Sequence, residues 1–199
     1  LQSIVANVHD IKYEILVVDN NSEDSSVEKI REIFSQVILS INQTKFGFAK
    51  NNNINLRKAS GRYLMLLNDD TLVQPNSLEM AVKYLEENPD VGVLGCKMIN
   101  PDGSFQIGSA RRFRTFYTIF MSELGLNKHI NKIPVSGDVA EEIELPQEAG
   151  MIVRREVVKE VGLLDERFFM FGEEVDGDSR SKGVGWKIMF FPECQIIHF

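Results

Sequence analysis

Short apolar runs alternate with segments of helical periodicity along most of this chain. Residues 25–37, about 47–59 and 78–85 carry apolar side chains at helical spacing, and four apolar runs lie around them: YEILVV (13–18), VILSI (37–41), YLMLL (63–67) and VGVLG (91–95). Strands that are apolar throughout are typical of a sheet covered by helices on both faces. The pattern predicts an α/β fold with a mostly parallel, doubly wound sheet.

The later half of the chain is less regular. PDG at 101–103 marks a turn, and the sequence is weakly patterned to about residue 148. The runs GMIVRREVVKEVG (150–162) and KIMFFPECQIIHF (187–199) are then expected to be strand-like. A length of 199 residues suits one substantial core, so we expect a single domain over residues 1–199.

Charge and cysteine content exclude several classes of protein. The 22 basic and 29 acidic residues give a net charge of −7, which argues against a nucleic-acid partner. Cys96 and Cys194 are too few for a disulfide framework or a zinc site, and we therefore expect a cytoplasmic protein. No apolar run reaches the roughly 18 residues of a membrane span.

Acidic side chains follow two of the predicted strands. Asp19 ends the first run, and Asn68, Asp69 and Asp70 follow YLMLL directly. Because ligands of doubly wound sheets bind beyond the carboxyl ends of the strands, we expect three carboxylates at one edge of one sheet. Paired carboxylates suit Mg²⁺ or Mn²⁺. The alternative is that Asp69 and Asp70 only stabilise the following turn.

Four blocks of sequence, taken together, resemble the family 2 glycosyltransferases. They occur in the order EILVVDNNSEDSS, GFAKNNN, ASGRYLMLLNDDTLVQP and VGLLDERFFMFGEEVD with the later R, GW and QIIH. The resemblance covers nearly the whole chain and is closest to the rhamnosyltransferase-like branch, which builds bacterial polysaccharides. It implies a glycosyltransferase A type fold in which residues 1–100 bind a nucleotide sugar and residues 101–199 bind the acceptor. In that family a central strand precedes the segment LQSIVANVHDI, so we expect a fragment that lacks the first strand and exposes an unpaired sheet edge.

The resemblance also implies which residues bind the donor and a metal ion. The nucleotide-sugar residues are Asp19, Asn21, Ser22, Asn53, Asp69 and Gly150. The metal ligands, for Mn²⁺ or Mg²⁺, are Asp70 first, with Asn68 and His198. Alternatives remain open: Ser22 or Asp24 caps the helix over 25–37, Asn53 serves a turn, and His198 is structural.

On the acceptor side, FFMFGEEVD (168–176) matches the segment that supplies the catalytic base in the family. The match assigns the base to Glu174, with Glu173 as the alternative, and gives Asp176 a part in orienting the acceptor. Arg180 and Trp186 are expected to contact the acceptor. Gly177 and Gly183 weaken the helix expected here. The competing interpretation is a solvated acidic helix start, favoured by the helix dipole.

These expectations predict a metal-dependent inverting glycosyltransferase. It would move a sugar, with rhamnose as the leading candidate, from a dTDP- or UDP-linked donor to a saccharide or lipid-linked acceptor. The alternative is a nucleotide-sugar binding or scaffolding domain without turnover. The segment ARRFRTFYTIF (110–120) interleaves arginines with aromatic residues, which suits peripheral contact with the inner face of the membrane. A core-packing helix with a basic end is the competing account.

Overall fold

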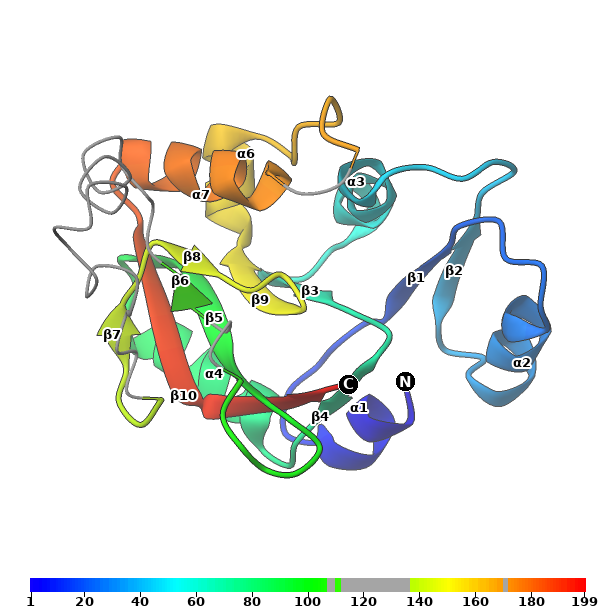
Figure 1. The fold of residues 1–199 in the computed structure, drawn as a ribbon, viewed down its shortest axis with the longest axis horizontal. Coiled ribbons are helices and arrows are strands. Elements are labelled where there is room, and N and C mark those ends of the chain that lie inside the picture. Colours follow the sequence, from blue (N-terminus) through cyan, green and yellow to red (C-terminus); the bar gives the residue numbers. More distant parts are fainter. Residues whose placement is uncertain (107–109, 112–136, 170–171) are drawn as a thin grey trace, which may run out of the picture.

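The computed structural model describes residues 1–106, 110–111, 137–169 and 172–199 (Figure 1). Its helices are α1 (Gln2–Asn7), α2 (Ser26–Ile33), α3 (Phe48–Lys58), α4 (Ser77–Glu87), α6 (Arg155–Val161) and α7 (Glu173–Gly183). Its strands are β1 (Leu16–Asp19), β2 (Ile38–Ile41), β3 (Tyr63–Leu67), β4 (Thr71–Val73), β5 (Val91–Ile99), β6 (Ala110–Arg111), β7 (Glu141–Glu142), β8 (Leu145–Pro146), β9 (Gly150–Arg154) and β10 (Lys187–His198).

The main sheet has the strand order β3-β9-β5-β10-β4, with β7 also paired to β10. Strand β10 runs parallel to β5, whereas β9 is antiparallel to both β3 and β5, and β4 and β7 are antiparallel to β10. The α/β fold is confirmed, but the sheet is mixed rather than mostly parallel. An apolar run fits any strand that is buried on both faces, so the composition of a strand does not reveal its direction.

Strands β1 and β2 form a separate parallel pair and are not hydrogen-bonded to the main sheet. Figure 1 shows them beside α2, across a gap from β3. Among the described strands β3 pairs only with β9, so its other edge is unpaired, as expected. The expectation that Asp19 and Asp70 lie on one sheet is therefore wrong. The Glu14 carboxylate links the two sheets by accepting hydrogen bonds from the Ser60 and Gly61 backbone N–H groups (2.6 and 3.2 Å).

Helices cover both faces of the main sheet. On one face Ala81 and Leu85 of α4 pack against the strands, and on the other Leu56 of α3 and Leu164 pack there (Figure 1). At the outer edge, Ser3 Oγ of α1 accepts the Val73 N–H of β4 (3.1 Å) and Asn7 donates to the Val73 carbonyl (2.8 Å). These two side chains satisfy backbone groups that an edge strand otherwise leaves to solvent.

The segment 150–162 is only partly a strand. Strand β9 ends at Arg154, and residues 155–161 form α6, which corrects the strand-like prediction. The Arg154 guanidinium donates to the Leu85, Asn88 and Val91 carbonyls (2.7, 3.3 and 3.0 Å). Arg155 donates to the carbonyls of Ala59 and Gly61, both at 2.6 Å. The two arginines thus fix the point where strand gives way to helix.

The two cysteines, far apart in the sequence, are neighbours in the core. Cys96 on β5 and Cys194 on β10 are both buried, and their Sγ atoms are 3.0 Å apart.

The segment 110–120 is described only at Ala110 and Arg111, which form β6. The remainder lies outside the described residues, so membrane contact stays a prediction. Within the described part of the chain, no helix is long and apolar enough to cross a membrane.

Candidate active site

The ends of several strands meet at one edge of the main sheet. Leu67, the last residue of β3, lies opposite Gly150, the first of β9, while Thr71 of β4 lies opposite His198, the last of β10. Residues 68–70 connect β3 to β4. The register therefore places the predicted metal residues of both chain segments at the same edge.

Asp70 and His198 are brought into contact there. His198 Nε2 lies 3.4 Å from Asp70 Oδ1, and the N–H of Phe199 donates to the Asp70 carbonyl at 3.1 Å. The Asp70 side chain is 49% exposed and that of His198 is 15% exposed. This is a carboxylate open to solvent next to a largely buried imidazole.

Gln106, for which no sequence motif predicted a role, orients the His198 ring. Its Oε1 lies 3.0 Å from His198 Nδ1, while its Nε2 donates to Asn100 Oδ1 at 3.2 Å. Because an amide oxygen only accepts, this contact favours the tautomer of the neutral imidazole with the proton on Nδ1 and the lone pair on Nε2. A histidine held in this way presents Nε2 as a metal ligand.

The geometry of this pair fits a divalent cation. Two ligand atoms each about 2.1 Å from one ion, at an angle of about 90–110°, are separated by roughly 3.0–3.4 Å. The Asp70–His198 separation of 3.4 Å lies at the upper end of this range. Within the described residues no group of three His, Cys, Asp or Glu side chains surrounds a common point. The pair alone therefore leaves most of the coordination sphere of such a cation to other groups.

The other members of this edge have mixed surroundings. The Asn68 N–H donates to the Ala149 carbonyl (3.2 Å), and the Asn68 carbonyl accepts from Thr71 Oγ1 (2.6 Å), which closes the turn. Asp69 is exposed like Asp70, so neither carboxylate incurs the cost of burial. Gly150 is buried, and a Cβ there would lie only 2.7 Å from Ile196 Cδ1. Gly150 thus allows close packing behind the edge.

Asp19 ends β1 and is 7% exposed. Its Oδ2 accepts the backbone N–H of Ser22 at 3.2 Å, and Asn21 between them has a left-handed φ of 61°. The N-cap of α2 is Ser25, and Asp24 just before it accepts the Ser26 N–H on Oδ1 at 3.0 Å. Hydrogen bonds from Ser26 lower the Asp24 pKa. Neither Ser22 nor Asp24 is the N-cap of this helix, although the Asp24 carboxylate accepts the N–H of its first residue.

Three asparagines hold the loop that follows β2, namely Asn20, Asn42 and Asn51, and none of them was among the predicted site residues. Asn20 donates to the Phe46 carbonyl (2.9 Å) and accepts its N–H (2.8 Å). Asn42 Nδ2 donates to Asn51 Oδ1 at 2.8 Å, and Asn51 donates to the Phe46 carbonyl at 3.2 Å. The network fixes the entry to α3 against the end of β1.

Helix α7 forms from residue 173 despite its glycines, and it carries the predicted base at its start. Glu173 is 1% exposed, and its Oε2 has no hydrogen-bond partner among the residues that the structure describes. A solvated helix start is therefore the wrong interpretation for Glu173. Glu174 lies on the same first turn, but its side chain is outside the description.

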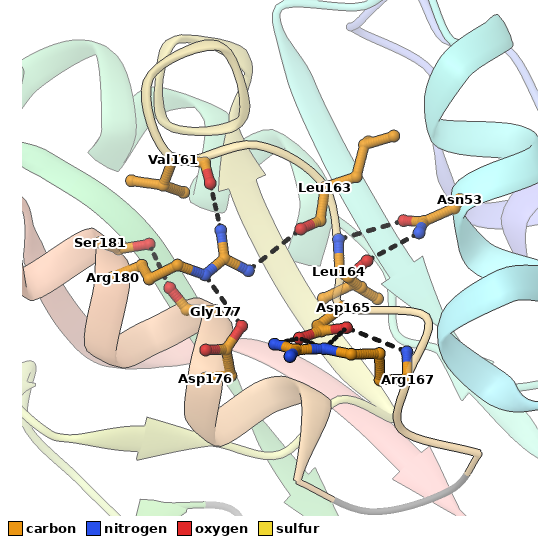
Figure 2. Close-up of polar contacts among 10 residues, drawn as sticks. All are labelled: Asn53, Val161, Leu163, Leu164, Asp165, Arg167, Asp176, Gly177, Arg180 and Ser181. Carbon is orange, nitrogen blue, oxygen red and sulfur yellow. Dashed lines mark hydrogen bonds and ion pairs between the residues drawn. The ribbon is translucent and has the colours of Figure 1, made fainter.

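Asp176, Arg180 and Asn53 are engaged within the protein (Figure 2). Arg180 Nε donates to Asp176 Oδ2 at 2.8 Å, and its other nitrogens donate to main-chain carbonyls of residues 161 and 163. Asn53, 1% exposed, donates to the Leu164 carbonyl (2.8 Å) and accepts its N–H (3.1 Å). Asn53 lies inside α3, so the predicted turn role is wrong, and its amide instead holds the backbone of Leu164.

Trp186 lies away from the other predicted residues. It precedes Lys187, which pairs with Val91 at the start of β5, whereas His198 is at the opposite end of β10. The indole N–H donates to Glu160 Oε2 at 2.9 Å. The structure therefore does not bring Trp186 to the edge that holds Asp70.

Comparison with known proteins decides the family. The family described as "Glycosyl transferase family 2" matches residues 1–162, which is most of the chain. The chain belongs to glycosyl transferase family 2. The resemblance found in its sequence is confirmed.

Curated relatives of this family 2 chain include rhamnosyltransferases. It is 26% identical to the rhamnosyltransferase WbbL of Escherichia coli K12, over 97% of the chain and 75% of WbbL. It is also 26% identical to the N-acetylglucosaminyl-diphospho-decaprenol L-rhamnosyltransferase of Mycobacterium tuberculosis, over 92% of the chain and 66% of that protein. The O-antigen biosynthesis protein RfbC of Myxococcus xanthus is 26% identical too, but the chain spans only 16% of its length.

Solved structures share the fold. The chain superposes on GalNAc-T7, solved with UDP, GalNAc and Mn²⁺, with a TM-score of 0.72 and 19% identity, over 98% of the chain and 39% of GalNAc-T7. It superposes on the mannosyltransferase PcManGT of Pyrobaculum calidifontis, in complex with GDP-Man and Mn²⁺, with a TM-score of 0.66 and 20% identity, over 99% and 52% of the two chains. At this level of identity both likenesses show the fold alone.

Proposed function

We propose that this chain forms the catalytic region of an inverting glycosyltransferase that uses a nucleoside-diphosphate sugar. The observation that carries the proposal is the contact between Asp70 and His198, 3.4 Å apart at the edge of the sheet, with the imidazole oriented by Gln106. Family membership and the names of the relatives support the same reaction class.

In this proposal the donor lies over residues 1–100. Asp19 would accept hydrogen bonds from the base or ribose, with Asn21 and Ser22 beside it in the turn. Asp69, which is exposed next to Asp70, would also contact the donor. Gly150 contributes the close packing behind this edge.

Asp70 and His198 would hold Mn²⁺ or Mg²⁺, with Asn68 as a further oxygen donor. When bound, the cation would neutralise the negative charge of the leaving diphosphate. Carboxylate and amide oxygens suit either ion, whereas an imidazole nitrogen is a poorer ligand for Mg²⁺, which prefers oxygen. The presence of Mn²⁺ in the two solved glycosyltransferases named above supports this assignment.

The acceptor half, residues 101–199, supplies the base from the start of α7. Glu174, or Glu173 in its place, takes the proton from an acceptor hydroxyl while that oxygen bonds to the anomeric carbon. The bond from the anomeric carbon to the diphosphate breaks in the same step, and its electron pair leaves with the diphosphate. Attack from the face opposite the leaving group inverts the configuration and needs no enzyme nucleophile.

We infer that the sugar is rhamnose from a dTDP-linked or UDP-linked donor, and that the acceptor is a saccharide or a lipid-linked sugar. Two of the relatives are rhamnosyltransferases by name, and one of these is named for a diphospho-decaprenol acceptor. A nucleotide-sugar binding domain without turnover is the competing function, favoured by the unpaired edge of β3.

The deciding experiment is calorimetric titration of dTDP and UDP into the chain, with Mn²⁺ and with EDTA. We compare the wild type with Asp70→Ala and with Asp90→Ala, which removes an ion pair with Lys187 at the opposite end of β5. Metal-dependent binding that is lost in Asp70→Ala and kept in Asp90→Ala supports the proposal. Binding that ignores both EDTA and Asp70→Ala contradicts the metal assignment. Turnover of dTDP-rhamnose then separates the transferase from the binding domain.

A further inference from the structure

The loop of residues 162–169 connects α6 to the segment that leads into α7, and side chains from two helices hold its backbone (Figure 2). Arg180 reaches the loop from α7, and Asn53 reaches it from α3. Both contacts join residues that are apart in the sequence: Asn53 and Leu164 are separated by 111 positions, and Arg180 and Leu163 by 17. The loop thus joins three helices through polar contacts to its main chain.

Arg180 caps the C-terminus of α6. Its guanidinium donates to the carbonyl of Val161, the last residue of that helix, and to the Leu163 carbonyl at 3.0 Å. Asp176, one turn earlier on α7, fixes the guanidinium through Nε at 2.8 Å. The last carbonyls of a helix lack partners within the helix, and a cation there is also favoured by the helix dipole. Arg180 therefore attaches the second turn of α7 to the end of α6.

Asn53 attaches the middle of the loop to α3. Its amide makes a reciprocal pair of hydrogen bonds with the main chain of Leu164, and it also donates to Glu166 Oε1 at 3.0 Å. Arg57, one helical turn later, forms an ion pair with the same Glu166 oxygen at 2.7 Å. A fully buried amide with its donors and acceptor all satisfied specifies one position of the loop.

The end of the loop is attached to the start of α3. The Phe48 N–H donates to the Phe169 carbonyl at 2.9 Å. The preceding residue is Gly47, and a Cβ there would lie only 2.8 Å from Phe169 Cα. Phe169 stands three residues before Gly172, which is the N-cap of α7. The end of the loop is thus tied to the N-terminus of α3.

We propose that Asn53 and Arg180 are positioning residues that hold α7, with Glu173 and Glu174 at its start, at a fixed position relative to α3. They act through the loop of residues 162–169 and do not contact the substrate. The inference rests on the proposed function for its effect on turnover, but its structural part stands apart from that function. The family resemblance implied that Asn53 contacts the nucleotide sugar and Arg180 the acceptor. In this proposal both residues act on the position of α7 instead.

The test uses hydrogen exchange, donor binding and turnover on three variants of the chain. Asn53→Leu removes the amide from α3, Arg180→Lys removes the forked donor from α7, and Gly47→Ala pushes on Phe169 from α3. Gly183→Ala is the matched control, since a Cβ there meets nothing within 4 Å. Circular dichroism establishes that each variant is folded. If Asn53→Leu does not fold, Gly47→Ala tests the same loop by steric contact alone.

We expect faster exchange in peptides of residues 173–183 in Asn53→Leu and Gly47→Ala, although neither position is on α7. Turnover should fall at least 10-fold in all three variants, while the Kd for UDP or dTDP changes by less than twofold. Gly183→Ala should match the wild type in turnover and in donor Kd, and it should not speed exchange in α7, because Ala favours a helix more than Gly does. Unchanged exchange in α7 overturns the inference, and this holds even if the wild type has no transferase activity. A donor Kd weakened in parallel with turnover also overturns it, because that marks a ligand contact.

Discussion

Replacing Gln106 should weaken metal binding without removing a metal ligand. Gln106 Oε1 accepts from His198 Nδ1 at 3.0 Å, and its amide is itself fixed by Asn100 at 3.2 Å. In Gln106→Leu the imidazole loses this acceptor, so the ring is free to rotate and to exchange its tautomer. Only part of the His198 population then presents the lone pair of Nε2 beside Asp70.

The size of the effect follows from the role of this hydrogen bond. Removing the partner that orients a metal-binding histidine typically lowers metal affinity by about 10–100-fold. That range corresponds to about 1.4–2.7 kcal/mol. Because His198 is only 15% exposed, water is a poor substitute for the amide oxygen, and we expect the upper part of the range. Gln106→Glu retains an acceptor at the same place and should bind the ion at least as well as the wild type.

The assay is calorimetric titration of Mn²⁺ into the chain in the presence of saturating dTDP or UDP. Gln106→Leu should show the weakened Mn²⁺ affinity, Gln106→Glu should not, and Asp70→Ala gives the limit reached when a ligand itself is removed. The reasoning is refuted if Gln106→Leu binds Mn²⁺ like the wild type. It is also refuted if Gln106→Glu falls as far as Gln106→Leu.

Two further predictions concern stability. Arg154→Met removes three charge-assisted hydrogen bonds to carbonyls at the end of α4 and the start of β5, and it should lower the free energy of unfolding in urea by about 3 kcal/mol. The control is Arg62→Met, which removes one ion pair from a side chain that is 74% exposed and should lower the same free energy by at most about 0.5 kcal/mol. Equal losses in the two variants would contradict the argument. The hydrogen bond with Cys194, together with burial, raises the pKa of the Cys96 thiol well above its ordinary value. Above about pH 8.5 the unfolded chain loses the thiol proton while the folded protein keeps it, so the free energy of unfolding falls as the pH rises. Urea unfolding under reducing conditions should therefore show stability falling between pH 7.5 and 9.5 more steeply in the wild type than in Cys96→Ala, and parallel slopes would exclude this cause.

Much of the fold was predictable from local patterns. The apolar runs at 63–67 and 91–95 are strands, and the helical spacing of residues 78–85 marks α4. The prediction was wrong at residues 155–161, where the valines favoured a strand but the chain forms α6. Arg154 and Arg155, at the boundary between β9 and α6, bind carbonyl groups that come close to them only in the folded chain. Local propensity is weak beside such contacts.

The sequence by itself determined the alternation of strands and helices as far as β5, the family, and the placement of acidic residues directly after strands. These features depend on side-chain periodicity and short motifs, whose physical effects act within a few residues. Only the tertiary structure decided the direction of β9, the separation of Asp19 from the sheet of Asp70, and the contact of Asp70 with His198. It also decided that Gln106 orients the histidine and that Asn53 holds Leu164. Those pairs lie far apart in the sequence, and their meeting depends on strand register and on the burial of polar groups that must each find a partner.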